Sequence, residues 1–325
     1  MIFPDLLPQF ADWIGDVRGK LIANHPLAKV SWFRVGGPAQ LYFEPADEAD
    51  LVHFLKNLPA GIRVLTIGLG SNLLIRDGGV DGVVIKLPAK AFGQVEVLTD
   101  NRISVGAGLP DVKLATAAAN AGIDGMEFYR GIPGAIGGAL YMNAGCYGTE
   151  THQRVVCLRG VTREGDVIEL SNADMDYRYR KSNGPKGVIF TSATFEGLPG
   201  DRDEILTKMR DITDRRESTQ PTNTRTGGST FKNPDGHSAW KLIDEAGCRG
   251  LRIGDAQVSE MHTNFLINLD AATAHDIELL GETVRNKVRE KHGIDLSWEI
   301  RRIGHFEPGK EVRQFLDGDV FAGAH

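Results

Sequence analysis

Two polar residues of the C-terminal third stand where they could take part in chemistry. Ser229 follows Gly227 and Gly228, so its hydroxyl would be exposed, and Lys232 and Asn233 supply a cation and an amide beside it. On the residues alone, a serine after two glycines is more often a turn residue. Glu299 lies between apolar neighbours, where desolvation would raise its pKa or an arginine would hold it ionised, although a strand glutamate is usually a salt-bridge partner.

Two arginines lie in the segment 177–182 and could bind an anion. Arg178 and Arg180 are spaced by two, so an extended chain would point both side chains to one side. The alternative is an exposed pair on a strand edge. The residues by themselves do not choose between the two arginines.

Three glycine-rich loops could hold a ligand through backbone N–H groups, at 68–72, 106–108 and 131–138. Such a loop between strands suits a pyrophosphate. The first loop runs into a strand and not into a long helix, so it is not the dinucleotide-binding fingerprint, and each loop alone could be a tight turn. The third continues into small residues and Asn143, which could approach and hydrogen-bond a planar ring.

The elements that must position these residues can be read from hydrophobic periodicity and turn signals. We expect a first α+β lobe with a helix over 47–58 and strands over 63–67 and 83–87. A second lobe follows, with a strand at 103–105, a helix ending at Gly122, a hairpin over 155–170 and a strand over 188–195. Helices are further expected over 202–217, 237–246 and 271–291, and strands over 264–268 and 295–303. We expect the last helix to be capped by Asp270, with Thr273 and Asp276.

Composition excludes several classes of protein. The formal net charge of the 325 residues is −6 and no basic run is present, so no nucleic-acid partner is expected. The three cysteines form no Cys-x-x-Cys pair and His237, His262 and His292 are scattered, so we expect no metal site. No apolar run of about 18 residues predicts a membrane span, and the first eight residues lack a signal peptide's basic region. We expect a cytoplasmic protein without an obligate protein partner.

In their order along the chain, the motifs resemble the UDP-N-acetylenolpyruvoylglucosamine reductase family. The matching segments are Phe33-Arg34-Val35-Gly36-Gly37, Gly68-x-Gly70-Ser71-Asn72-Leu73, Gly106-x-Gly108, Gly131-Ile132-Pro133-Gly134, Asn143-x-Gly145-x-Tyr147-Gly148 and Gly228-Ser229-x-Phe231-Lys232-Asn233-Pro234. The resemblance spans about residues 28 to 306. It implies an α+β fold: a two-lobed FAD-binding domain of the vanillyl-alcohol-oxidase type over 28–200, with lobes of about 28–88 and 89–200, and a smaller α+β substrate-binding domain over 205–306.

The resemblance also implies roles for individual residues. Ser229 falls on the family's proton donor, Arg180 fits its Tyr-Arg-x-Ser motif as the arginine that meets the substrate carboxylate, and Glu299 falls on its catalytic glutamate, with Trp298 in place of the usual proline. The implied substrate-binding residues are Tyr147, Lys232 and Asn233. The implied FAD-binding residues are Arg34, Gly68, Gly70, Ser71, Asn72, Gly106, Gly108, Ile132, Pro133, Gly134, Gly138, Asn143 and Gly145.

The activity implied is NADPH-dependent reduction of the enolpyruvyl ether of UDP-N-acetylglucosamine to UDP-N-acetylmuramate, a step of peptidoglycan precursor synthesis, with FAD bound non-covalently. No tyrosine follows Tyr179, so the chain resembles the shorter subtype that lacks a tyrosine loop over the diphosphate. One alternative is an oxidase of the same flavin fold with FAD tethered through a histidine or a cysteine such as Cys146 or Cys157. Another is a nucleotide-sugar sensor with an inactive site.

Overall fold

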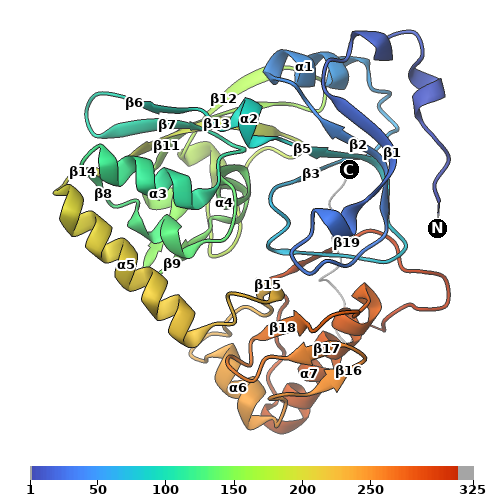
Figure 1. The fold of residues 1–325 in the computed structure, drawn as a ribbon, viewed down its shortest axis with the longest axis vertical. Helices are drawn as coiled ribbons and strands as arrows, with labels where there is room; N and C mark the ends of the chain where they lie inside the picture. The colour runs from blue at the N-terminus through green and yellow to red at the C-terminus, as the bar shows by residue number, and fades with distance from the viewer. Residues whose placement is uncertain (1, 314–325) are drawn as a thin grey trace.

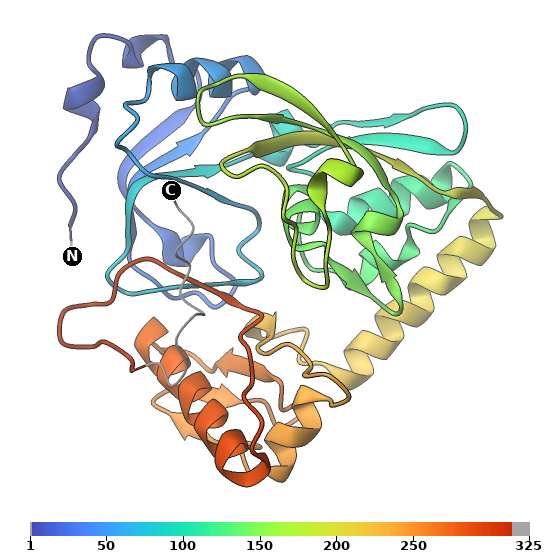
Figure 2. The same ribbon diagram turned by 180° about the vertical axis from the view of Figure 1, so that it is seen from behind.

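The computed structural model describes residues 2–313, which form two α+β lobes and a C-terminal α+β part. Figure 1 shows the lobes side by side with the C-terminal part beneath them, and the reverse view in Figure 2 shows the same arrangement. The first lobe is a four-stranded sheet in the order β1-β2-β5-β3. Its elements are β1 (Lys20–Pro26), β2 (Pro38–Glu44), α1 (Glu48–Asn57), β3 (Val64–Ile67), β4 (Leu73–Ile75) and β5 (Val80–Lys86).

The expected elements of this lobe are confirmed. Helix α1 begins where the Asp47 side chain accepts a hydrogen bond from the Asp50 N–H, and its apolar stripe buries Leu51, Phe54 and Leu55. The strands expected at 63–67 and 83–87 are β3 and β5, which pair in parallel. Parallel pairing brings the loop after β3, residues 68–72, to one end of this sheet.

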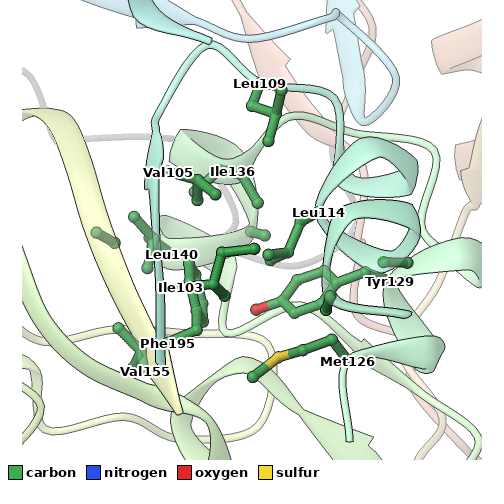
Figure 3. Packing of buried hydrophobic residues seen from close by; sticks show 14 of the residues in the cluster. Ile103, Val105, Leu109, Leu114, Met126, Tyr129, Ile136, Leu140, Val155 and Phe195 are labelled. Carbon is green, nitrogen blue, oxygen red and sulfur yellow. The ribbon is translucent and has the colours of Figure 1, made fainter. Parts of the chain in front are cut away.

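The second lobe is a five-stranded antiparallel sheet in the order β12-β11-β13-β7-β6, with two helices on one face. Figure 3 shows side chains of β7 and of both helices pointing into one shared core, with Ile103, Leu114 and Leu140 among them. The elements are α2 (Ala89–Phe92), β6 (Val95–Val97), β7 (Arg102–Gly106), α3 (Asp111–Asn120), β8 (Ile123–Asp124), α4 (Ile136–Met142), β9 (Gly145–Cys146), β10 (Thr149–Glu150), β11 (Val155–Val161), β12 (Val167–Ser171), β13 (Ile189–Glu196) and β14 (Leu198–Pro199).

Helix α5 (Arg202–Thr219) runs along one edge of the molecule from the second lobe toward the C-terminal part (Figure 1). Its buried residues, Ile205 and Met209, lie in the core of the second lobe. The C-terminal domain expected over 205–306 therefore includes a helix that packs on the second lobe.

The C-terminal part packs two helices on a four-stranded antiparallel sheet of order β15-β18-β17-β16. Its elements are β15 (Arg225–Ser229), α6 (Ala239–Glu245), β16 (Arg252–Ile253), β17 (Ala256–Val258), β18 (Phe265–Asn268), α7 (Ala274–His292) and β19 (Arg301–Ile303). The expected Asp270 cap of α7 is wrong, because Thr273 is the N-cap and forms a capping box with Asp276. Asp270 instead accepts a hydrogen bond from Arg225 at 3.2 Å.

Strand β19 lies outside the C-terminal sheet and pairs in parallel with β4 of the first lobe. The expected strand over 295–303 is thus regular only at its end, with one isolated bridge between Trp298 and Phe231. Beside this crossing lies a buried charge ladder, the chain of ion pairs Arg76–Glu278–Arg302–Glu282–Arg285 with N–O distances of 2.8 to 3.3 Å. The ladder and the strand pair together join the C-terminal part to the first lobe.

Candidate active site

The segment 297–301 lies between the loop 68–72 and the segment that carries Ser229. On one side, the Arg301 N–H donates to the Asn72 carbonyl at 3.1 Å, and the Asn72 side-chain amide donates to the Glu299 carbonyl at 3.3 Å. On the other side, the Glu299 N–H donates to the Thr230 carbonyl at 2.8 Å. These bonds bring Glu299, the first glycine loop and the serine segment to one place.

Ser229 is the last residue of β15 and lies opposite Phe265 of β18. Gly227, two residues before it, packs so closely on Phe33 that a Cβ there would lie 2.5 Å from the ring. Gly228 has a φ of +82°, which favours glycine, and open space where a Cβ would be. Within residues 2–313 the Ser229 hydroxyl has no hydrogen-bond partner, so it is available to a ligand.

Arg180 lies in a tight turn in which Arg178 and Lys181 exchange two backbone hydrogen bonds, at 2.8 and 3.1 Å. Its φ of 55° lies in the left-handed region that an arginine rarely adopts. The guanidinium donates from Nε to Glu299 Oε1 at 3.0 Å and from Nη2 to the Gly145 carbonyl at 2.8 Å. Its Nη1 lies 3.6 Å from Glu150 Oε1. These contacts hold the strained turn in place.

The structure distinguishes Arg178 from Arg180, between which the sequence could not choose. The Arg178 side chain is 69% exposed and pairs with Asp176 at 2.8 Å, whereas the Arg180 side chain is 18% exposed and pairs with Glu299. Only Arg180 reaches Glu299.

Burial is the largest influence on the Glu299 carboxyl and raises its pKa, while the positive charges of Arg180 and Lys232 act against that rise. Lys232 therefore lies near the carboxylate, and the Lys232 backbone N–H donates to the Ser297 carbonyl at 2.9 Å. The arrangement joins an arginine, a lysine and a desolvated carboxyl next to the segment that carries Ser229. Such a set can bind an anion and move a proton.

The other two expected substrate-binding residues are Asn233, next to Lys232, and Tyr147, two residues after Gly145. The Asn233 side-chain oxygen accepts a bond from the Ala239 N–H at 2.9 Å, at the start of α6. Burial raises the pKa of Tyr179, and the Asn233 backbone acts against that rise. Tyr147 is 41% exposed, and the Arg215 guanidinium lies 5.3 Å from its ring centre.

Two of the expected cofactor loops face one another across the lobes. A Cβ built on Gly68 would meet only Ala135, at 3.9 Å, and one built on Gly138 would meet nothing within 4 Å. Among the described residues, no acceptor is bonded to the backbone N–H groups of Leu69, Gly70 or Ser71. The facing loops, which include Asn72, Ile132, Pro133 and Gly134, therefore leave room and free donors for a phosphate-bearing ligand.

Other expected cofactor residues serve the protein's own packing. Gly106 and Gly108 lie against Phe92, and their N–H groups donate to Gln94 and Phe92 at 2.9 and 2.8 Å. The Asn143 side chain is fully buried and bonded to Glu150, Arg178 and His152. The Arg34 guanidinium donates to the Lys29 carbonyl at 2.9 Å.

Sequence reasoning missed three groups near the site. Glu150 contacts both Arg180 and Asn143, the half-buried Arg301 guanidinium lies 4.0 Å from the Tyr141 ring centre, and Asp111 is fully buried beneath Gly134. Burial raises the pKa of Asp111 well above its usual range, and neither carboxyl oxygen has a partner in the described residues. No local pattern marks these residues, because each acquires its surroundings only from distant segments.

Two kinds of feature are absent from residues 2–313. These residues contain no cluster of three histidine, cysteine or acidic side chains that could hold a metal ion. Nor does any helix in this range combine the length and apolar character needed to cross a bilayer.

Comparisons with known proteins show which families and solved structures the chain is similar to. Residues 220–303 match the family described as UDP-N-acetylenolpyruvoylglucosamine reductase, C-terminal domain, and residues 39–171 match the FAD binding domain family. The chain is 59% identical over 302 residues to the UDP-N-acetylenolpyruvoylglucosamine reductase of Azorhizobium caulinodans, covering 93% of this chain and 97% of that protein. It is also similar to the crystal structure of the Thermus caldophilus enzyme of that name, with a TM-score of 0.75 and 32% identity over 88% of this chain and 98% of that one.

Proposed function

Since the chain belongs to the UDP-N-acetylenolpyruvoylglucosamine reductase family of FAD-binding oxidoreductases, we propose that it reduces the enolpyruvyl ether of UDP-N-acetylglucosamine to UDP-N-acetylmuramate with NADPH as the electron source. The single observation that carries the proposal is the convergence of Arg180, Glu299 and the Ser229 segment beside the first glycine loop. We place the reaction in the cytoplasm, where both small-molecule substrates are expected.

The residues present fit FAD bound without a covalent tether. The free N–H groups of 69–71 and the open space at Gly68 and Gly138 suit its pyrophosphate and a close approach to the backbone. Gly145 supplies its carbonyl to Arg180, so this part of the loop would position the arginine next to the bound ring. When bound, FAD would carry hydride from NADPH to the terminal methylene carbon of the enolpyruvyl group.

The chain's own residues would handle the charge and the proton. Arg180 retains N–H donors beyond its two hydrogen bonds, so it can bind the substrate carboxylate and stabilise the charge that develops next to it. Ser229 would donate its hydroxyl proton to the carbon beside the carboxylate. Glu299 would orient Arg180 and polarise the site, and Lys232, Asn233 and Tyr147 would bind the remainder of the substrate.

Two alternative functions are less well supported. A tethered oxidase needs a reactive nucleophile, but burial raises the pKa of the Cys146 thiol to about 12, and Cys157 lies on the exposed side of β11. A nucleotide-sugar sensor would have no use for a strained arginine turn aimed at a buried carboxyl.

An anaerobic titration of the purified protein tests the proposal. NADPH should bleach the flavin absorbance, and the enolpyruvyl substrate should then restore it with formation of the lactyl ether. Reoxidation by oxygen alone would favour the oxidase, and binding of the UDP-sugar without any change in flavin absorbance would favour the sensor.

A further inference from the structure

The Trp298 side chain joins the two segments that carry Ser229 and Glu299. Trp298 is 6% exposed, and its ring centre lies 5.0 Å from that of Phe231. The backbones of the two residues form an isolated antiparallel β-bridge. Phe231 is two residues after Ser229, and Trp298 is directly before Glu299. Because neighbouring side chains of an extended chain point to opposite sides, Trp298 enters the core while Glu299 faces Arg180.

The Trp298 ring packs on helix α7 at Gly281, where any larger residue would overlap the ring. A Cβ built on Gly281 would overlap the Trp298 atoms Cη2 and Cζ2. The indole N–H donates to Glu282 Oε1 at 2.8 Å, and the Arg302 guanidinium lies 4.6 Å from the ring centre. Glu282 is itself part of the buried charge ladder. The indole is therefore fixed by packing, by one hydrogen bond and by one cation.

We propose that Trp298, seated on Gly281, is a positioning residue that sets the placement of Glu299 and Arg180 relative to the Ser229 hydroxyl during substrate reduction. This inference rests on the proposed function. A shift of the ring would displace Phe231 and Glu299 together. Phe231 is joined to Trp298 by the backbone bridge, and Glu299 is the next residue in the chain. Misplacement of reacting groups by about 1 Å can slow a reaction by roughly 100-fold.

The experiment compares Gly281→Ala, Trp298→Phe, the double variant and the control Gly61→Ala. Gly61 has nothing within 4 Å of a built Cβ, so the control makes the same chemical change without an overlap. Phenylalanine lacks the outer indole atoms that meet Gly281, and the double variant should therefore accommodate the new methyl group. Flavin reduction by NADPH and flavin reoxidation by the enolpyruvyl substrate are measured separately, together with thermal unfolding.

Gly281→Ala should slow reoxidation by about 10- to 100-fold and leave reduction within about twofold of wild type. Trp298→Phe alone should slow reoxidation several-fold, and the double variant should reoxidise faster than Gly281→Ala.

The pH profile of reoxidation should also move to higher pH in Gly281→Ala. The charged and titratable groups that face Glu299 are Arg180 and Tyr179 from the turn and Lys232 from the serine segment, with Glu150 behind Arg180. Because the positive charge of Arg180 lowers the pKa of Glu299, a weaker contact between them raises that pKa.

Each outcome decides between a positioning role and a merely structural one. Equal slowing of both half-reactions in the variants, an unshifted pH profile, or a double variant no faster than Gly281→Ala would overturn the inference. If Gly281→Ala does not fold, Trp298→Phe decides, and wild-type reoxidation by that variant would refute the positioning role. A wild-type protein whose flavin is not reoxidised by the substrate would contradict the proposed function instead.

Discussion

At the scale of single residues, the unpartnered Ser229 hydroxyl gives the most direct test of the chemistry. Ser229→Ala removes one oxygen from a glycine-flanked position and should leave folding and FAD binding intact. NADPH should still bleach the flavin at a near-normal rate, while reoxidation by the substrate should slow by roughly 100- to 10,000-fold, the scale expected for loss of a general acid. Stopped-flow absorbance separates the two steps, and equal slowing of both would indicate a structural role.

The two arginines of the turn make a matched pair. Arg180→Lys should impair reoxidation much more than reduction, because an ammonium cannot reproduce the fork that holds Glu299, Gly145 and a carboxylate. Arg178→Lys should change little, since that side chain is exposed and pairs only with Asp176. Similar kinetics for the two variants would show that the assignment to Arg180 is wrong.

Residue types and spacing predicted Ser229 and Glu299 as candidates but could not choose between Arg178 and Arg180. The choice depends on the backbone of the turn, in which Arg180 adopts a positive φ that no sequence rule assigns to an arginine. Likewise, the sequence could not show that Gly106 and Gly108 are required by contact with Phe92, because that contact comes from a separate helix.

At the scale of elements, the start of helix α7 distinguishes a true cap from an apparent one. Thr273→Ala should lower the free energy of unfolding by about 1 kcal/mol, because the Thr273 hydroxyl accepts the Asp276 N–H at 3.1 Å. Asp270→Ala removes only an exposed contact with Arg225 and should have an effect near zero. Urea titration of both variants gives their free energies of unfolding, and a larger decrease for Asp270→Ala would show that Asp270 is the N-cap.

The first turn of helix α3 contains a fully buried carboxyl group, Asp111, whose oxygens have no hydrogen-bond partner within residues 2–313. Its pKa is raised on folding, so its contribution to stability is complete below the unfolded-state pKa of about 3.9 and is lost as the pH rises toward the folded-state pKa. Asp111→Asn does not titrate. Its melting temperature should therefore match wild type near pH 4 and exceed it increasingly toward pH 8. A variant less stable at every pH would show that the carboxyl makes a bond that the amide cannot replace.

Most elements could be predicted because their signals are local. The apolar stripe of α1, the hairpin of β11 and β12 and the alanine-rich α3 all lie within a few residues of the expected positions. Helix α7 was found but its cap was misplaced by three residues, since Asp270 and Thr273 are both acceptable cap residues by type. The pairing of β19 with β4 could not be predicted, because neither three-residue segment carries information about its distant partner.

At the scale of the whole molecule, the buried charge ladder connects the first lobe to the C-terminal part. Arg76→Leu leaves the fully buried Glu278 with one of its two cationic partners and should lower the free energy of unfolding by about 3 to 5 kcal/mol. Arg225→Leu breaks an exposed pair and should cost at most about 1 kcal/mol. Urea midpoints give both values, and equal effects would mean that the ladder contributes no more than a surface ion pair.

The parallel pairing of β4 with β19 has a consequence for biosynthesis. Residues 73–75 leave the ribosome long before residues 301–303, at about 5 to 20 residues per second, so roughly 10 to 45 seconds separate them. Over that interval the loop ending at Asn72 has neither of its bonds to the segment 299–301. The nascent first lobe can form its own sheet, but the candidate active site is completed only after residues 299–303 have left the ribosome.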